Sequence, residues 1–182
     1  MMPKFRIRQD IGQIADSYHQ ISVGGMYFRP YDALKDKVVA KYSAADWSLI
    51  FPEMTEEELV EYSNCSNVVV LIWCDGDTDE ALGMLYLEEA HDDLGTLVFH
   101  GGTWNHNPAY HCKIYRSLVF LLNQLLIRSF KICTTCSLDN AKADKLQQAM
   151  GFEEKGRDEC VIFKTLSVRK FTESSIVKRM LA

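Results

Sequence analysis

The strongest hydrophobic pattern in the chain lies between residues 110 and 127. Six apolar residues recur there three and four positions apart, at Ile114, Leu118, Leu121, Leu122, Leu125 and Leu126. This spacing places all of them on one face of a helix. The sequence therefore predicts one long amphipathic helix that buries this face against the rest of the protein.

Before this helix the pattern is that of β-strands. Val68 to Cys74 is a run of β-branched and aromatic residues, and Ala81 to Glu88 is a second apolar run. Asp75-Gly76-Asp77 between them is a turn signal. The polar segment 91–95 then leads to a third candidate strand, Thr96 to Trp104. These runs predict an antiparallel meander.

After the long helix the chain alternates between strand and helix patterns. Phe130 to Ser137 reads as a strand, and the helix before it is long enough to allow parallel pairing with the third strand. Ala143, Leu146 and Met150 mark a shorter helix, which Gly151 ends as a left-handed cap. A last strand, Cys160 to Lys164, and a terminal helix, Thr172 to Leu181, are predicted to follow.

The first part of the chain reads mainly as helices. Ile11 to Ile21 and Tyr31 to Tyr42 are amphipathic candidates. Thr55 and Glu58 have the spacing of a capping box, in which each residue bonds the other's backbone N–H, so a third short helix is expected there.

Composition narrows the class of protein. The 182 residues are 47% hydrophobic and 25% charged, with no repeat or linker, which predicts a single globular domain over 1–182. The net charge of −5 argues against nucleic acid as a partner. The sequence has neither a membrane-spanning apolar segment nor an export signal, so a cytoplasmic location is expected.

The six cysteines are expected to be free thiols. Cys133 and Cys136 have a spacing that can begin a zinc site, but residues three apart on a strand point to opposite faces. His106 and His111 have no third ligand at a defined spacing. The sequence therefore predicts no metal site.

The order of these elements resembles that of the GNAT N-acetyltransferases over residues 67–166. The segment from Asn140 to Phe152 is also similar to the family's, because Asn opens a helix, Ala follows three residues later, and Gly-Phe leads into the final strand. The resemblance implies an α/β (α+β) fold with a mixed, mostly antiparallel sheet flanked by helices and splayed between the fourth and fifth strands.

Two alignments remain for the family's first strand and helix. They match either Phe5 to His19 or Met26 to Tyr42, and the second is preferred because the next helix and the meander follow it directly. On this alignment 1–25 is an N-terminal extension, 26–166 is the core, and 167–182 is a C-terminal helix. Apolar residues within that basic tail suggest docking on the sheet edge or a homodimer contact.

The resemblance also implies acetyl-CoA as cosubstrate. In the family the CoA pyrophosphate rests on backbone N–H groups at the start of the long helix, where small residues allow a close approach. Here Tyr110, Lys113 and Tyr115 stand at the motif positions, and all three depart from it. Either Lys113 supplies side-chain charge together with His111 or His106, or the loop only begins a helix. The cofactor-binding candidates are Thr103, Trp104, Asn105, His111, Lys113 and Asn140.

Catalysis of amine acetylation needs a group that accepts the amine proton. Glu88 stands near the position of the family's base, and His100 is a second candidate, because its unperturbed pKa suits a base near neutrality. Each also has a purely structural interpretation, Glu88 in a solvated turn and His100 as a hydrogen-bonded strand residue. The family's proton-donating Tyr is replaced by Gln147, which cannot act as an acid.

Two functions are compatible with these residues. The first is an acyl-CoA-dependent N-acetyltransferase that acts on an amine by direct transfer in a ternary complex. The second is a catalytically inactive GNAT-fold module that binds a protein or a small ligand. Fold alone does not decide between them.

Overall fold

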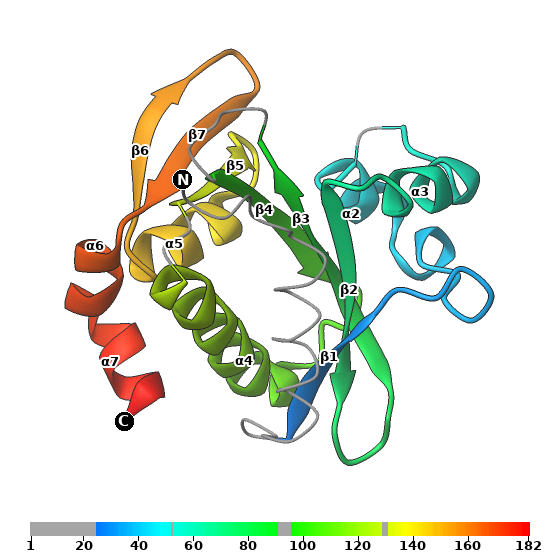
Figure 1. The fold of residues 1–182 in the computed structure, drawn as a ribbon, viewed down its shortest axis with the longest axis horizontal. Coiled ribbons are helices and arrows are strands. Elements are labelled where there is room, and N and C mark those ends of the chain that lie inside the picture. The colour runs from blue at the N-terminus through cyan, green and yellow to red at the C-terminus, as the bar shows by residue number, and fades with distance from the viewer. Residues whose placement is uncertain (1–24, 52, 91–95, 129–130) are drawn as a thin grey trace, which may run out of the picture.

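The computed structural model describes residues 25–51, 53–90, 96–128 and 131–182, and they form one mixed sheet with helices on both faces (Figure 1). Its strands lie in the order β1-β2-β3-β4-β5-β7-β6. Their bounds are Met26–Pro30 for β1, Val68–Asp75 for β2, Ala81–Glu89 for β3, Thr96–Thr103 for β4, Lys131–Ser137 for β5, Phe152–Arg157 for β6 and Val161–Leu166 for β7.

The predicted meander and crossover are both present. Strands β2, β3 and β4 are antiparallel neighbours, and β4 pairs in parallel with β5 through the crossover helix α4 (Pro108–Ile127). The β4–β5 pairing covers only Thr96 to Val98 against Lys131 to Cys133. Beyond these three pairs the two strands diverge, which confirms the predicted splay.

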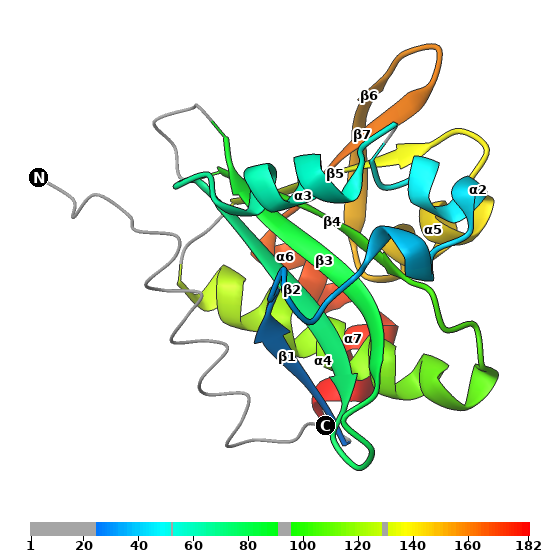
Figure 2. The same ribbon diagram turned by 90° about the vertical axis from the view of Figure 1, so that its right-hand side faces the viewer.

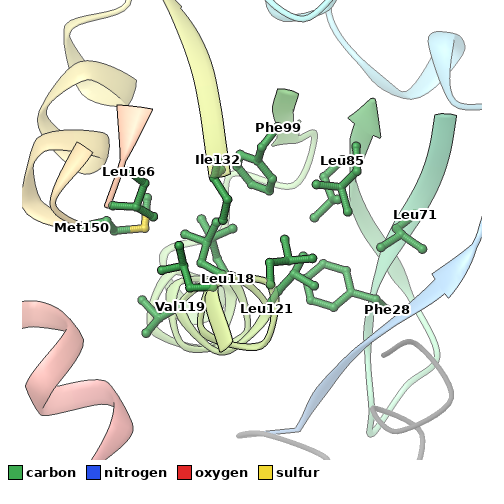
Figure 3. Packing of buried hydrophobic residues seen from close by; sticks show 14 of the residues in the cluster. Phe28, Leu71, Leu85, Phe99, Leu118, Val119, Leu121, Ile132, Met150 and Leu166 are labelled. Carbon is green, nitrogen blue, oxygen red and sulfur yellow. The ribbon is translucent and has the colours of Figure 1, made fainter. Parts of the chain in front are cut away.

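The apolar face of α4 packs under the sheet as its spacing predicts. Leu118 and Leu121 belong to a core cluster with side chains from all seven strands, among them Phe28 and Ile132 (Figure 3). Helix α5 (Ala141–Ala149) packs against β5 and β6, and Gly151, whose φ is +98°, follows its C-cap Met150. A Cβ on Gly151 would come within 2.6 Å of the Lys170 carbonyl oxygen, so this left-handed cap also allows the C-terminal segment to pack closely.

A second apolar cluster covers the opposite face of β2 and β3. It is built by the 3₁₀ turn η1 (Val39–Lys41), by α2 (Ala44–Ser48) and by α3 (Glu56–Ser63), which Figure 2 shows on the other side of the sheet from α4. Thr55 and Glu58 form the predicted capping box of α3. The rings of Trp47 and Phe51 pack against each other in this cluster with tilted planes and hold the short helices on the sheet.

Several predicted elements differ from the structure. Tyr31 to Tyr42 is not a helix but a turn followed by η1, because Asp36 bonds the Asp32 N–H and Glu56 bonds the N–H groups of Val38 and Val39. These carboxylates satisfy backbone donors that a helix would otherwise use. The candidate helix Ile11 to Ile21, the alternative first strand Phe5 to His19 and the turn 91–95 lie outside the described residues.

The end of the chain also differs. The sequence predicted one last strand, whereas β6 and β7 form a hairpin in which β7 lies between β5 and β6. The terminal helix is two helices, α6 (Val168–Glu173) and α7 (Ser175–Leu181), because Ser174 adopts φ −59° and ψ 130° and caps α7. None of the helices within the described residues is long and apolar enough to cross a membrane.

Candidate functional site

The divergence of β4 from β5 opens a cavity of about 270 Å³ through the sheet. One wall is the end of β4, from Phe99 to Thr103, and the other is the end of β5, from Thr134 to Ser137. Helix α2 contributes to the lining from one face of the sheet and α5 from the other. Figure 2 shows these two helices at the same end of the molecule. The cavity is therefore lined from both faces of the sheet.

The hydroxyl of Tyr42 is inserted between β3 and β4 beside this cavity. It donates to the Gly102 carbonyl oxygen at 2.6 Å and accepts from the Met84 N–H at 3.2 Å. Met84 and Gly102 are opposite each other in the ladder, so the hydroxyl bridges a pair that would otherwise bond directly. At the neighbouring pair, a Cβ on Gly101 would come within 2.4 Å of the Met84 carbonyl oxygen, so this position requires glycine.

Buried polar contacts fix α5 over the cleft. Lys164 of β7 is only 2% exposed and forms an ion pair with Asp144 of α5. Asn140 begins the helix, since its Oδ1 accepts the Ala143 N–H at 3.1 Å, and it lines the cavity. The side chain of Gln147 reaches back to the Thr135 carbonyl oxygen at 3.4 Å, and its buried Oε1 has no partner among the described residues.

His100 lies on β4 in the wall of the cavity. Its Nε2 is 3.1 Å from the Leu49 carbonyl oxygen, which can only accept, so the neutral ring carries its proton on Nε2. The remaining nitrogen, Nδ1, is then the basic one. Burial lowers the pKa of His100 below its ordinary value, although the bond to Leu49 partly opposes this. The ring stacks on Tyr86, which fixes its plane.

The mouth of the cavity carries three ionisable side chains. Asp46 of α2 is 3.3 Å from Nε2 of His106, which belongs to the loop between β4 and α4, and Lys142 of α5 also lines the opening. A hydrogen bond from the Ser43 hydroxyl is the main cause that lowers the pKa of Asp46. This arrangement presents one carboxylate and two basic groups to a ligand at the rim.

The other predicted cofactor-binding residues lie at different places. Thr103 lines the cavity. Trp104 donates from Nε1 to the Ala81 carbonyl oxygen, and Asn105 donates to Glu80 at 3.3 Å, so both face the β2–β3 hairpin. The exposed ring of His111 stacks on Tyr115. The ammonium of Lys113 is 3.5 Å from Asp77 and 3.9 Å from Asp75.

Glu88, the first candidate for the base, lies at the opposite end of β3 from the cavity. It pairs with Val98, next to the short junction with β5, and accepts a hydrogen bond from the Tyr62 hydroxyl at 2.8 Å. The structure thus separates Glu88 from His100, Thr103 and Asn140, which it brings together around the cavity.

Sequence reasoning did not select several residues of the cavity, among them Tyr42, Asp46, Thr134 and Cys136. A signal for Asp46 was available, because Ser43-Ala44-Ala45-Asp46 has the spacing of a helix start, and Ser43 does cap α2. No local signal marks Tyr42, whose partners are 42 and 60 positions away.

Cys133 and Cys136 lie on β5, half-buried and buried, as their strand pattern predicted. Burial raises the pKa of the Cys136 thiol. Within the described ranges no group of three metal-ligating side chains comes together.

The architecture is similar to that of several solved structures. No family model and no curated protein sequence matches the chain. Among solved structures, the spermidine N-acetyltransferase of Vibrio cholerae with CoA and spermine is similar at a TM-score of 0.65 and 15% identity, over 82% of this chain and 99% of that one. An apo nucleotide-linked sugar GNAT gives 0.66 and 15%, over 86% and 94%.

A third similar structure is an aminoglycoside acetyltransferase in complex with coenzyme A and kanamycin. Its TM-score is 0.62 and its identity 16%, over 82% of this chain and 98% of that one. At such identities the likeness concerns the arrangement of the backbone. The protein described here therefore has the fold of the GNAT N-acetyltransferases. Its sheet is splayed between β4 and β5, where its cavity lies.

Proposed function

We propose that the protein is an N-acyltransferase that moves an acetyl group from the thioester of acetyl-CoA to an amine by direct transfer in a ternary complex. The observation that carries this proposal is the cavity between β4 and β5, which has a partly buried neutral imidazole in its wall. The fold supports it, as do two of the similar structures, which contain coenzyme A together with spermine or kanamycin.

The cavity has groups that fit the pantetheine arm of the donor. The N–H of Trp104 bonds Leu82 of β3, so by strand alternation Gly101 and Thr103 direct their backbone groups away from β3. β5 has already diverged at this level, so these groups face the gap. An amide-containing arm can pair with them as a strand would, with Asn140 on the opposite wall.

His100 is the residue we assign as general base. The lone pair of the amine nitrogen attacks the thioester carbonyl carbon, a C–N bond forms, and the C–S bond breaks. Nδ1 of His100 accepts the proton that the amine loses. The departing thiolate takes up one proton and leaves as a thiol, so the net transfer is one proton from the amine to the sulfur. Because burial lowers the pKa of His100, the imidazole is unprotonated and ready to accept at neutral pH.

A second function has one observation in its favour. The motif positions at the start of α4 hold Tyr110, Lys113 and Tyr115 in place of the small residues that allow phosphate to approach a helix N-terminus, and Pro108 has no N–H to offer. A GNAT-fold module without catalytic activity would have no need of that site.

Turnover with His100 variants tests the enzymatic function. Purified protein, acetyl-CoA and a panel of primary amines are expected to give an acetylated product detectable by mass spectrometry. His100→Gln keeps a donor for the Leu49 carbonyl but has no base, so kcat should fall by about 100-fold. Glu88→Gln should retain the wild-type rate, because Glu88 lies away from the cavity.

The opposite pattern would overturn the assignment. A loss of rate in Glu88→Gln with none in His100→Gln would place the base at the other end of β3. If no amine is acetylated and calorimetry detects no donor binding at all, the protein is a binding module and not a transferase.

A further inference from the structure

The first three residues of α4 have no unbonded backbone donor to give to a phosphate. Position 108 is proline, the Ala109 N–H is bonded to the side chain of Asn107 at 3.0 Å, and the Tyr110 N–H is bonded to the Asn107 carbonyl oxygen at 3.0 Å. The Asn107 N–H is itself bonded to Asn105 Oδ1 at 2.9 Å. An anion arriving here would have to displace bonds that the loop makes with itself.

The surface next to this turn is negatively charged. Asp77, Asp79 and Glu80 are exposed on the turn from β2 into β3, and Asp75 is buried at the end of β2. This hairpin contacts α4 through the pair Lys113–Asp77 and the loop before α4 through the pair Asn105–Glu80. The one lysine of the first two turns, Lys113, already has two carboxylates within 4 Å. Four acidic side chains beside one compensated lysine oppose the approach of a polyphosphate.

The size of the cavity fits an extended arm better than a whole nucleotide-bearing donor. At about 270 Å³ it is slightly smaller than the roughly 300–1,000 Å³ typical of ligand pockets. It provides polar backbone groups along a narrow gap, as an extended amide arm requires. The features that recognise a donor are therefore concentrated in the gap and not at the helix start.

We infer that the protein recognises its acyl donor through the pantetheine thioester arm alone, and that the 3′-phosphoadenosine diphosphate of CoA contributes nothing to binding. This inference rests on the proposed function, since it concerns the donor of the same reaction. It assigns the substrate class as acyl-pantetheine thioesters, of which acetyl-CoA is one carrier.

Calorimetry with two donors tests the inference without any turnover. S-acetylpantetheine and acetyl-CoA, each without an acceptor, are expected to bind with dissociation constants within about threefold of each other, whereas a recognised phosphate is worth about 10- to 100-fold. Raising the ionic strength should leave both constants unchanged, since no phosphate contact is screened.

Two results overturn the inference while the proposed function stands. One is acetyl-CoA binding more than about 10-fold tighter than S-acetylpantetheine, and the other is a steep weakening of acetyl-CoA binding with salt. If neither donor binds, the proposed function fails together with it. Binding of both donors at similar strength supports both.

A lysine substitution gives an independent arm. Lys113→Ala is expected to leave the dissociation constant of acetyl-CoA within about twofold of wild type, because the ammonium of Lys113 is paired with Asp75 and Asp77 of the hairpin. Arg116→Ala, one turn further along α4, is the matched control for loss of one positive charge. A 10-fold or larger loss, on the order of one charged hydrogen bond, in Lys113→Ala alone would show that this lysine holds a phosphate.

Discussion

At the scale of single residues, the environment of His100 decides what its imidazole can do. The Leu49 carbonyl oxygen at 3.1 Å selects the tautomer, the Tyr86 ring fixes the plane, and burial disfavours the charged form. None of these partners carries a charge, so nothing among them compensates a protonated ring. The protonated form of His100 is therefore not stabilised, and the ring readily releases a proton that it accepts during acetyl transfer.

The lowered pKa of His100 predicts how stability depends on pH. Because the folded-state pKa lies below the unfolded value of about 6.5, the unfolded chain binds the proton more readily. The contribution to stability is complete above pH 6.5 and is lost as pH falls from there toward the folded pKa. Urea unfolding of wild type between pH 7.5 and 5 should show this decline, and His100→Gln should show a smaller one.

The same shift predicts the acid side of the rate profile. The value of kcat/KM should stay constant from neutrality to below pH 6.5 and should fall only as His100 becomes protonated in the folded enzyme. An acid limb centred at or above 6.5, or an identical limb in His100→Gln, would mean that another group controls the rate.

Residue types indicated His100 and Asn140 in the sequence, because imidazole and a helix-capping amide are identifiable locally. The compensation of Lys113 could not be predicted in the same way. Its partners Asp75 and Asp77 lie on another element, and only the folded hairpin brings them within 4 Å. For the same reason Glu88 looked equivalent to His100 until the register of β3 against β4 separated them.

At the scale of elements, the sequence predicted those with a strong period or a local cap. The apolar face of α4 and the capping box of α3 depend on contacts within a few residues, and both are present. Strand β6 was missed because it is a charged edge strand, Phe-Glu-Glu-Lys-Gly-Arg, without alternating burial. The prediction of a helix from Tyr31 to Tyr42 was wrong because Glu56, which is distant in sequence, accepts hydrogen bonds from the backbone of this segment.

The C-terminal helices provide a prediction at this scale. Phe171 of α6 and Val177 of α7 are each 1% exposed and join the main core, and Ser174 between them donates to the Ala149 carbonyl oxygen. Phe171→Ala should lower the free energy of unfolding by about 3 kcal/mol, since it removes a fully buried ring. Truncation after Leu166 should cost more.

A matched control is Leu181→Ala, because Leu181 lies in α7 but is 43% exposed. It should change the free energy of unfolding by less than about 0.5 kcal/mol. If the truncated protein kept both its melting temperature and its mass in solution, the tail would be a passive extension. A change of mass with unchanged stability would instead support the homodimer contact that the apolar tail suggested.

At the scale of the whole molecule, the sheet consists of two halves with a short junction. Strands β1 to β4 form one half and β5, β7 and β6 the other, and three residue pairs connect them (Figure 1). Helix α4 runs beneath the junction and packs on strands of both halves (Figure 3). The halves are thus held together mainly by a shared apolar core, which leaves the far ends of β4 and β5 free to form the cavity.

Hydrogen exchange provides the last prediction, because it reports on backbone groups in this gap directly. The amides of Gly101 and Thr103 point away from β3 toward the gap, so they should exchange quickly in the free protein. Binding of S-acetylpantetheine should slow them if the arm pairs with β4. Leu85 and Leu87 in the middle of β3, which are fully buried, are the internal controls, and their amides should not change.

The amide of His111, near the start of α4, should not change with acetyl-CoA either, because the nucleotide is not held there. Protection that appeared at His111 and spared Gly101 would show that the donor binds by its phosphates, and would move the site from the gap to the helix.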